Sequence, residues 1–549
     1  MRLHDLATIE EYTKSGHWKG ETILDLFSSQ VSNFPHKLAI QDPLDKKDLV
    51  GIDPQSLTWS QLDQVVDSLA LALIKLGLNQ DEIILVQLPN IWELIALYLA
   101  ISKAGGIISP LPMQWQNQEI STVLKSTQAK LFIGTTNFKG NSYLNFDCLK
   151  NITKVSLDEL KVLINENNEI EKNQFLDLEK RASKVDSNDI FSICWTSGTE
   201  AESKGCPYSH NNWLYQSGNL VKILELTSDA RLLATPPIVN MTGVGVIFVP
   251  WILTGGTLLL HHPLNLDLLL SQLSSQEPNF TILVPTLLNK IIQDSDTEDL
   301  DLSSLSTIAT GSAPPPVSTI EYFKKRWNID IINIWGQNEG PSLIAGTQDV
   351  TSRKDRSSCF PWWGNPSYDW PSGVTGIKTK IKFDSKYHPI SNSIVGELCY
   401  KGPNLFPGYF NNEQLNKKFF DSEGYFSTGD IFAVQKEKYL VFFDRKKDII
   451  IRGGFNISAA EIENLALMNP KISEAAAVGI NDEIMGEILA LFVVLKPNVQ
   501  STDQQIIDFF TKLDIAKYKI PEIVKIIDSF ERNALGKINK TKLRSSISK

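Results

Sequence analysis

Cysteine is scarce in this sequence, and the residues present form no recognisable pattern. The chain has 549 residues and five cysteines. No two of them have the short spacing of a zinc site, and they do not form the dense framework of a small disulfide-rich domain. A fold built on zinc or on disulfides is therefore not expected, and a reducing, cytoplasmic setting fits.

The sequence also lacks a long apolar run and a secretory signal. Its most apolar stretch, residues 244–260, is interrupted by Pro250, Gly255 and Gly256 and falls short of a bilayer span. The first residues lead into charged sequence with no apolar core. A net charge of −10 disfavours non-specific binding to nucleic acid or anionic membranes. We therefore expect a cytoplasmic protein without a membrane span or a nucleic-acid partner.

The composition, 42% hydrophobic and 21% charged residues, is that of an ordinary globular protein, and the length allows several buried cores. Helix and strand patterns alternate from about residue 20. A helix capped at Ser60 and ending near Gly77 precedes apolar strands at 83–88 and 107–110, with a helix over 91–104 between them. Later residues repeat this order, with a strand at 280–285 and a helix through the 240s. The alternation predicts an α/β fold with doubly wound sheets.

The pattern becomes strand-rich from about residue 375, which predicts a β-rich subdomain. A charged cluster at 444–448 separates it from a final hundred residues with helices and strands of their own. We therefore predict a large N-terminal domain over residues 1–444 and a small, mobile α+β domain over 445–549. A solvated hairpin end is the alternative explanation of the charged cluster.

Residues 196–205 read Thr-Ser-Gly-Thr-Glu-Ala-Glu-Ser-Lys-Gly and follow an apolar strand at 191–195. Hydroxyls, glycine amides and a lysine suit a loop that wraps phosphate oxygens. A P-loop is excluded, because Gly205 occupies the place after Lys204 where the metal-binding hydroxyl would stand. A plain polar turn is the alternative on this segment alone.

Two further polar clusters follow apolar strands. Residues 311–315 come after a strand at 306–310, and residues 335–340 come after a strand at 331–334. Ligands of open α/β sheets bind outside the carboxyl ends of the strands. We therefore expect both clusters to line a ligand site.

Taken in order, these segments resemble the superfamily of adenylate-forming enzymes, which includes acyl- and aryl-CoA ligases, non-ribosomal adenylation domains and luciferases. The matching motifs lie at 196–205, 335–339, 427–430, 444–448, 452–463 and 533–538. The departures from the family pattern are Glu200, Ala201 and Ser203 in the phosphate loop and Asn338 in a threonine position. Segments 12–20, 87–91 and 452–461 look closest to stand-alone aryl-acid adenylating enzymes.

The resemblance implies binding of ATP and Mg²⁺. The residues implied in ATP binding are Thr196, Ser197, Gly198, Thr199, Lys204, Gly311, Ser312, Ala313, Trp335, Gly336, Asn338, Asp430, Arg445 and Lys537. Among them Lys537, Lys204 and Asn338 would be catalytic, because joining a carboxylate to a phosphate requires neutralisation of negative charge. Glu339 would hold the metal, and Glu200 is expected to face away from ATP.

The same resemblance assigns the remaining roles. Asp430 and Arg445 would bind the ribose, and Trp335 would stack on adenine, with core packing as its alternative. A hinge at Lys447 would rotate the small domain, withdraw Lys537 and bring Gly453 and Gly454 to a tunnel for a pantetheine thiol.

The acid pocket is expected near Asn240, Gly311 and Gly340. Segment 237–243 contains no acidic residue that could neutralise a substrate ammonium, so an aryl or small acyl acid is favoured over an amino acid. Asn240 could equally be a satisfied core amide.

The function predicted is activation of such an acid to an acyl-adenylate with release of pyrophosphate, then transfer to coenzyme A or to an acyl or peptidyl carrier protein. Coenzyme A would need basic residues, for which Lys401, Lys446 and Arg452 are candidates. One alternative is a stand-alone amino-acid adenylation enzyme that loads a peptidyl carrier protein. Another is a non-catalytic nucleotide-binding relative, although five charged motif residues argue against it: Lys204, Glu339, Asp430, Arg445 and Lys537.

Overall fold

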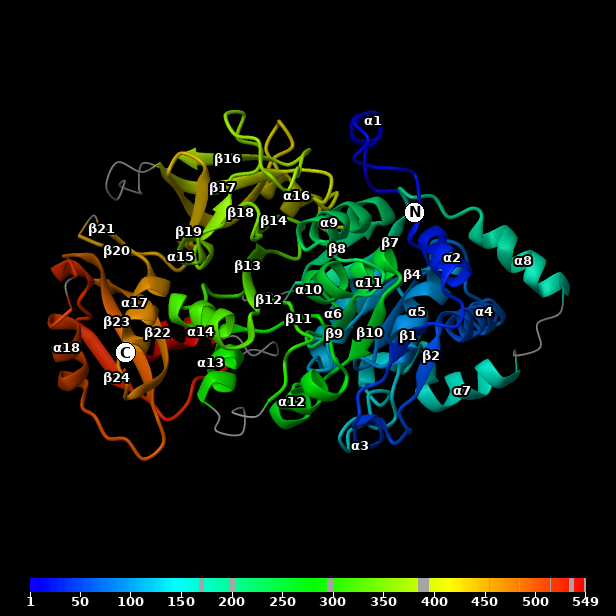
Figure 1. Ribbon diagram of the computed structural model, residues 1–549, viewed down its shortest axis with the longest axis horizontal. Helices are drawn as coiled ribbons and strands as arrows, with labels where there is room; N and C mark the ends of the chain where they lie inside the picture. Colours follow the sequence, from blue (N-terminus) through cyan, green and yellow to red (C-terminus); the bar gives the residue numbers. More distant parts are fainter. Residues whose placement is uncertain are drawn as a thin grey trace. The chain divides into compact units, whose positions relative to one another are not determined.

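The computed structural model describes residues 1–166, 172–196, 203–293, 300–383, 394–453, 455–482, 484–513, 515–532 and 538–547 (Figure 1). The chain divides into two compact units. The first comprises Met1–Ile377 and Lys401–Lys418, and the second comprises Lys378–Tyr400 and Phe419–Lys549.

The first unit contains a six-stranded sheet with the order β6-β5-β3-β4-β7-β8. Its strands are β3 (Ile83–Gln87), β4 (Ile107–Pro110), β5 (Leu131–Gly134), β6 (Thr153–Ser156), β7 (Ile190–Trp195) and β8 (Gly205–Ser209). All neighbours are parallel except β7 and β8, which form an antiparallel pair.

The second sheet of this unit has eight strands in the order β14-β13-β12-β11-β9-β10-β1-β2. Its strands are β1 (Leu38–Gln41), β2 (Ser56–Thr58), β9 (Arg231–Ala234), β10 (Thr257–Leu260), β11 (Phe280–Ile282), β12 (Thr307–Thr310), β13 (Asp330–Gly336) and β14 (Ser342–Ala345). Only the edge pairs β1–β2 and β13–β14 are antiparallel. A short strand, β15 (Cys359–Pro361), follows.

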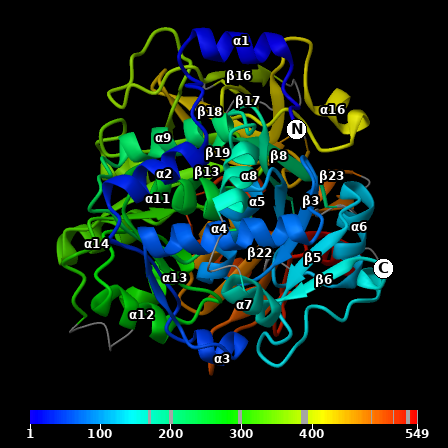
Figure 2. The ribbon, with the colours of Figure 1, turned by 90° about the vertical axis from the view of Figure 1, so that its right-hand side faces the viewer.

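Helices surround these sheets, and α11 packs against α2 and α9 (Figure 2). The helices from the N-terminus are α1 (Leu6–Lys14), α2 (Ile23–Asn33), α3 (Lys46–Val50), α4 (Trp59–Lys75), α5 (Trp92–Lys103), α6 (Asn117–Thr127), α7 (Leu157–Glu166), α8 (Lys172–Ala182) and α9 (His210–Ile223). They continue with α10 (Met241–Gly243), α11 (Val249–Thr254), α12 (Leu266–Ser275), α13 (Pro285–Gln293), α14 (Val317–Trp327), α15 (Arg353–Arg356) and α16 (Glu413–Phe419).

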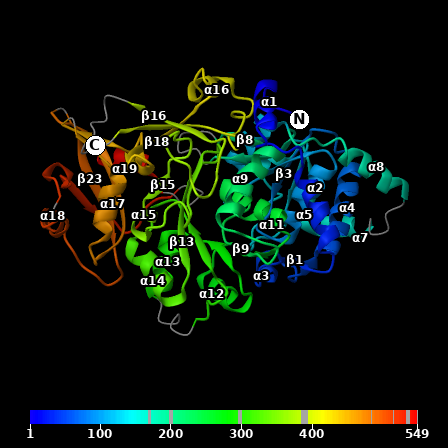
Figure 3. The ribbon, with the colours of Figure 1, turned by 45° about the horizontal axis from the view of Figure 1, so that its top comes forward.

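The second unit contains strands in the order β19-β18-β17-β16 and a separate sheet in the order β21-β20-β23-β22, in which β24 pairs with β23. The strands are β16 (Lys378–Phe383), β17 (Val395–Lys401), β18 (Phe426–Gln435), β19 (Tyr439–Arg445), β20 (Ile450–Arg452), β21 (Phe455–Ile457), β22 (Ile472–Asp482), β23 (Gly486–Leu495) and β24 (Ile523–Ile526). The helices are α17 (Ala459–Leu467), α18 (Asp503–Thr511) and α19 (Lys540–Ile547). Helix α17 packs against β22 and also contacts β23, beside which it lies in Figure 3.

The predicted α/β class with doubly wound sheets and a smaller C-terminal part is confirmed. The predicted domain boundary between residues 444 and 445 stays a prediction. Residues on both sides of it belong to the second compact unit, and compactness does not show which part of the chain moves.

Local signals located most elements but not all their ends. The helix predicted to be capped at Ser60 is capped by Thr58, whose side chain accepts from the Gln61 amide while the Gln61 side chain accepts from the Thr58 amide. The helix predicted through the 240s is divided into α10, a π-helical turn at Val244–Phe248, and α11. The strand predicted to run to Pro285 ends at Ile282, since Pro285 begins α13.

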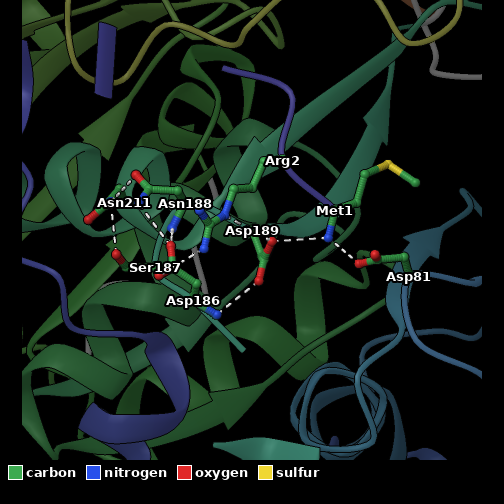
Figure 4. A network of polar contacts seen from close by, with 8 residues as sticks. All are labelled: Met1, Arg2, Asp81, Asp186, Ser187, Asn188, Asp189 and Asn211. Carbon is green, nitrogen blue, oxygen red and sulfur yellow. Dashed lines mark hydrogen bonds and ion pairs between the residues drawn. The ribbon is translucent and has the colours of Figure 1, made fainter. Parts of the chain in front are cut away.

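The first residues of the chain are held against strand β7 (Figure 4). The Met1 carbonyl accepts from the Ile190 amide at 2.8 Å, and the Met1 amino group contacts Asp81 and Asp189. The Arg2 guanidinium lies 3.1 Å from Asp186. These contacts attach the N-terminal segment to the sheet that carries the predicted phosphate loop.

A buried charged cluster joins α3 to α5 in the first unit. The Lys46 ammonium lies 2.7 Å from carboxylate oxygens of both Asp42 and Glu93, and the three side chains are almost completely buried. Asp42 also accepts from the backbone amides of Gln55 and Trp92. Burial raises the pKa of both carboxyl groups and Lys46 opposes the rise. The single cation therefore compensates two buried acids.

We expect Lys46→Met to lower the free energy of unfolding by about 3–5 kcal/mol, because it leaves buried carboxylates without a cation. A carboxyl group with a raised folded pKa contributes stability at low pH, and this contribution is lost as the pH rises through that pKa. The loss of stability in the variant should therefore be larger at about pH 8 than at about pH 5. Urea unfolding at both pH values measures it.

Lys47→Met is the matched control. The ion pair of Lys47 with Asp53 is largely exposed, so this substitution should have little effect at either pH. An equal loss for Lys46→Met at the two pH values would contradict the explanation.

Candidate active site in the first unit and ribose pair in the second

The predicted phosphate loop connects two antiparallel strands. Strand β7 leads to Thr196, whose amide donates to the Lys204 carbonyl at 3.0 Å and closes the base of the loop. Gly205 begins β8 opposite Trp195, and a Cβ at Gly205 would lie 3.1 Å from the Trp195 ring and 3.2 Å from Phe410. A side chain here would therefore be tightly packed, and these two aromatic residues would have to shift slightly to admit it.

The segment around Asn338 and Glu339 is the connection of a second hairpin. Strand β13 continues through Trp335 and Gly336, which the sequence analysis placed after the strand, and pairs with β14. The Gln337 amide donates to the Pro341 carbonyl, and the Gly340 amide donates to the Gln337 carbonyl. Gly340 has φ 113°, and a Cβ there would lie 2.4 Å from the Asn404 carbonyl. The turn thus presents Asn338 and Glu339 at the end of the hairpin.

The Asn338 side chain connects three segments. Its Nδ2 donates to the Trp195 carbonyl at 3.1 Å, and its Oδ1 accepts from the Met241 amide at 3.0 Å. The Asn338 carbonyl accepts from the Tyr208 hydroxyl at 2.6 Å. The base of the phosphate loop, the predicted acid pocket and the second hairpin are therefore joined at this residue.

Lys204 and Glu339 converge on Tyr409. The Tyr409 hydroxyl donates to Glu339 Oε1 at 2.8 Å, and the Lys204 ammonium lies 5.2 Å from the centre of the tyrosine ring. Burial and then the Glu339 carboxylate raise the pKa of the Tyr409 phenol, so it remains a hydrogen-bond donor. Tyr409 was not among the site residues predicted from the sequence. The sequence feature that could have pointed to it is the Phe-Pro-Gly-Tyr turn at 406–409.

Among the described parts of the chain, no group of three or more His, Cys, Asp or Glu residues could hold an ion. Mg²⁺ bound to a nucleotide needs only one or two carboxylates beside the phosphates and water, so a single partly buried Glu339 fits a Mg–ATP site.

The expected adenine site lies at the ends of β12 and β13. Gly311 follows β12, and a Cβ there would lie 2.8 Å from the Ile334 carbonyl. Ser312, with φ 72°, and Ala313 are exposed, whereas Trp335 is buried. These positions are compatible with stacking on one side of a base, and that role of Trp335 stays a prediction.

Asn240 has a structural role of its own. Its Oδ1 accepts from the Gly243 amide at 3.1 Å and caps α10. The preceding residues are held by Asn90, whose Oδ1 accepts from the Ile238 amide and whose Nδ2 donates to the Pro236 carbonyl. From the sequence, Asn90 was recognised only as part of the family-like segment 87–91. This buried amide positions the predicted acid pocket.

The predicted ribose-binding pair comes together in the second unit. Asp430 on β18 faces Arg445 on β19, with Arg445 Nε 3.8 Å from Asp430 Oδ1. The neighbouring Gly429 amide donates to Glu397, which also pairs with Lys446 at 2.9 Å. The Asp430 side chain is buried and Arg445 is partly exposed, so the carboxylate is held in place by its own strand pair.

The hinge and tunnel residues also lie in the second unit. Arg544 donates to the Lys447 carbonyl at 3.2 Å and to Asp448 at 3.1 Å. Gly453 has φ 54°, and a Cβ there would lie 2.7 Å from the Met485 methyl group. The predicted roles of Lys447 as hinge and Gly453 as tunnel wall remain predictions.

Several predicted site residues lie outside the described part of the chain. They are Ser197, Gly198, Thr199 and Glu200 in the phosphate loop, Gly454 in the tunnel segment, and Lys537. Their roles therefore stay predictions from the motifs.

Comparison with protein families decides the class. The family model of the AMP-binding enzymes matches residues 27–410. The model of the AMP-binding enzyme C-terminal domain matches residues 461–537. The chain belongs to the AMP-binding enzyme family. The predicted resemblance to adenylate-forming enzymes is thereby confirmed, and so is the class of AMP-forming carboxylic acid–thiol ligase.

Individual members of this family are similar to the chain along nearly its whole length. The medium-chain fatty-acid–CoA ligase of Escherichia coli K12 is 27% identical over 98% of this chain and 92% of its own. The 2,3-dihydroxybenzoate-AMP ligase of Bacillus subtilis 168 is 26% identical over 98% of this chain and 96% of its own. The solved structure of O-succinylbenzoate coenzyme A synthetase from Bacillus subtilis, in complex with ATP and magnesium ion, shares the fold. It has a TM-score of 0.77 and 20% identity, and covers 96% of this chain and 100% of that chain.

A separate structural finding concerns membranes. Across the described residues, no helix of this AMP-binding enzyme combines the length and apolar character needed to cross a bilayer.

We expect Asn338→Ala to release the Met241 amide, because it removes that amide's side-chain acceptor. Hydrogen exchange at Met241 should accelerate about tenfold, in line with the loss of about 1–1.5 kcal/mol per hydrogen bond. The Gly243 amide, held by Asn240, is the internal control and should change far less. Equal acceleration at both amides would instead indicate general unfolding of this segment.

Proposed function

We propose that this AMP-binding enzyme uses ATP to activate an aryl or small acyl carboxylic acid to an acyl-adenylate, and then transfers the acyl group to a pantetheine thiol. The observation that carries the proposal is the convergence of Lys204 and Glu339 on Tyr409, beside Asn338. A cation for phosphate oxygens and a carboxylate for magnesium are the two charges that a Mg–ATP complex requires.

In this proposal each charged residue has a defined task. Lys204 neutralises the β- and γ-phosphates, and Lys537 stabilises the charge that develops when the carboxylate attacks the α-phosphate. Asp430 accepts hydrogen bonds from the ribose, and Arg445 orients it. Glu339 holds Mg²⁺, which when bound would neutralise phosphate charge. The structurally similar O-succinylbenzoate coenzyme A synthetase is in complex with ATP and magnesium ion, which supports these cofactors.

The acid is proposed to lack an α-amino group. Segment 237–243 has no acidic side chain, and the Asn240 oxygen that could face a substrate ammonium accepts from the Gly243 amide. A buried ammonium without a carboxylate is unfavourable. The similar proteins named for a medium-chain fatty acid and for 2,3-dihydroxybenzoate act, by their names, on acids of this kind.

The acceptor is proposed to be a carrier protein rather than coenzyme A. Lys446 pairs with Glu397, and Arg452 pairs with Glu522. These are two of the three basic residues that could serve the phosphates of coenzyme A. Coenzyme A would have to displace these carboxylates, whereas the phosphopantetheine arm of a carrier protein carries only one phosphodiester.

The first test is carboxylate-dependent exchange of labelled pyrophosphate into ATP, with a panel of aryl, short acyl and amino acids. We expect exchange with one class of aryl or acyl acid, and its loss by at least about a thousandfold in Lys537→Ala, as for removal of a transition-state charge. Exchange with amino acids alone would refute the proposed substrate class. Absence of exchange throughout, with ATP still bound, would favour a non-catalytic relative.

The two half-reactions should separate in the same variant. Supplied with an acyl-adenylate of the activated acid, Lys537→Ala should form thioester at close to the wild-type rate, because the hinge movement removes this lysine before the thiol attacks. Parallel reactions with coenzyme A and with a phosphopantetheinylated carrier protein identify the acceptor. Equal loss of adenylation and thioester formation would refute the two-conformation mechanism.

A further inference from the structure

Residues 406–410 connect the two charged motifs of the first unit through their backbone. The Phe406 amide donates to the Glu339 carbonyl at 3.1 Å, and the Phe410 amide donates to the Gly205 carbonyl at 2.9 Å. The segment therefore begins at the hairpin that carries Glu339 and ends at the strand that follows Lys204. Tyr409 lies between these attachments.

The Tyr409 side chain repeats this connection. Its hydroxyl donates to Glu339 Oε1 at 2.8 Å, while its ring face receives the Lys204 ammonium at 5.2 Å from the ring centre. A hydrogen bond to a carboxylate is one of the stronger neutral-to-charged contacts, and a cation within about 6 Å of an aromatic face is attracted to it. One rigid side chain thus contacts a carboxylate and an ammonium through different parts of its surface.

The tyrosine is itself fixed from both sides. Its amide donates to Asn416 Oδ1 at 2.7 Å, and Asn416 Nδ2 donates back to the Tyr409 carbonyl at 3.3 Å. Gly408 has φ 134°, and a Cβ there would lie 2.7 Å from the Asn416 side chain. The Tyr409 side chain is buried, with 3% exposed surface, and meets Phe406 edge to face at 5.0 Å. These contacts leave its hydroxyl and ring in one position.

We propose that Tyr409 is a positioning residue that holds the Glu339 carboxylate and the Lys204 ammonium for a Mg–triphosphate group. The inference rests on the proposed function, because it takes these two residues as the metal and phosphate ligands. Opposite charges that face the same ligand also attract each other, and their direct pairing would oppose ligand binding. A tyrosine can hold each of the two charges without letting them pair, because its hydroxyl binds the Glu339 carboxylate and its ring face binds the Lys204 ammonium.

The test separates the hydroxyl from the ring. Tyr409→Phe keeps the ring and removes the hydrogen bond to Glu339, whereas Tyr409→Leu removes both. ATP binding is measured by titration calorimetry over a range of Mg²⁺ concentrations and without metal, so the readout is independent of catalysis. Tyr439→Phe is the matched control, since Tyr439 is a buried tyrosine on β19 of the second unit.

We expect Tyr409→Phe to raise the Mg²⁺ concentration needed for half-maximal ATP affinity by about tenfold, as expected for a lost hydrogen bond to a charged group. Its metal-free ATP affinity should stay within about twofold of wild type, because the ring still faces Lys204. Tyr409→Leu should in addition weaken metal-free binding by about three- to fivefold. Tyr439→Phe should change neither quantity.

A double-mutant cycle with Glu339→Ala distinguishes positioning from packing. If Tyr409 acts through Glu339, removing its hydroxyl in the Glu339→Ala background should add little to the change in metal dependence. An unchanged Mg²⁺ dependence in Tyr409→Phe would overturn the inference, even if the melting temperature fell. A Tyr409→Phe effect of the same size in both backgrounds would also overturn it. Wild-type protein that binds no ATP at any Mg²⁺ concentration would refute the proposed function itself.

Discussion

The side-chain amide of Asn338 is the interaction on which the site of the first unit depends. An amide carries a donor and an acceptor, so one side chain can satisfy a backbone carbonyl and a backbone amide that point toward it. Asn338 does this for the Trp195 carbonyl and the Met241 amide. The threonine that is usual at this position in the family is shorter, and its hydroxyl donates and accepts through one atom rather than through two. Here the longer amide joins the base of the predicted phosphate loop to the predicted acid pocket.

The charged residues of the site are carried by antiparallel hairpins at the ends of largely parallel sheets. Lys204 precedes β8, and Glu339 lies in the connection between β13 and β14. A hairpin projects its connection beyond the sheet, where side chains can reach a ligand, while the paired strands keep the backbone rigid. The third contributor, Tyr409, comes from a segment without regular structure that is fixed by hydrogen bonds to both hairpins.

Local patterns predicted much of the fold because helix and strand periods are properties of neighbouring residues. Strands β3 and β4 lie where the apolar runs at 83–88 and 107–110 predicted them, and helix α5 lies within the helix predicted over 91–104. The errors arose where two local signals competed. Thr58 with Gln61 forms the capping box that Ser60 does not, and the helix of the 240s is divided by a π-helical turn. The spacing of apolar residues contains no information about hydrogen-bond partners, so it could not distinguish between these outcomes.

The sequence by itself determined the family, the α/β class and the identity of the motif residues, because these depend on residue types at fixed short spacings. Only the tertiary structure decided which motifs meet. The hydrogen bonds of Asn338 to Met241 and Trp195 span 97 and 143 residues, and that of Tyr409 to Glu339 spans 70. Contacts at such separations form when the sheets pack and bring distant strand ends together, and no local pattern encodes that packing.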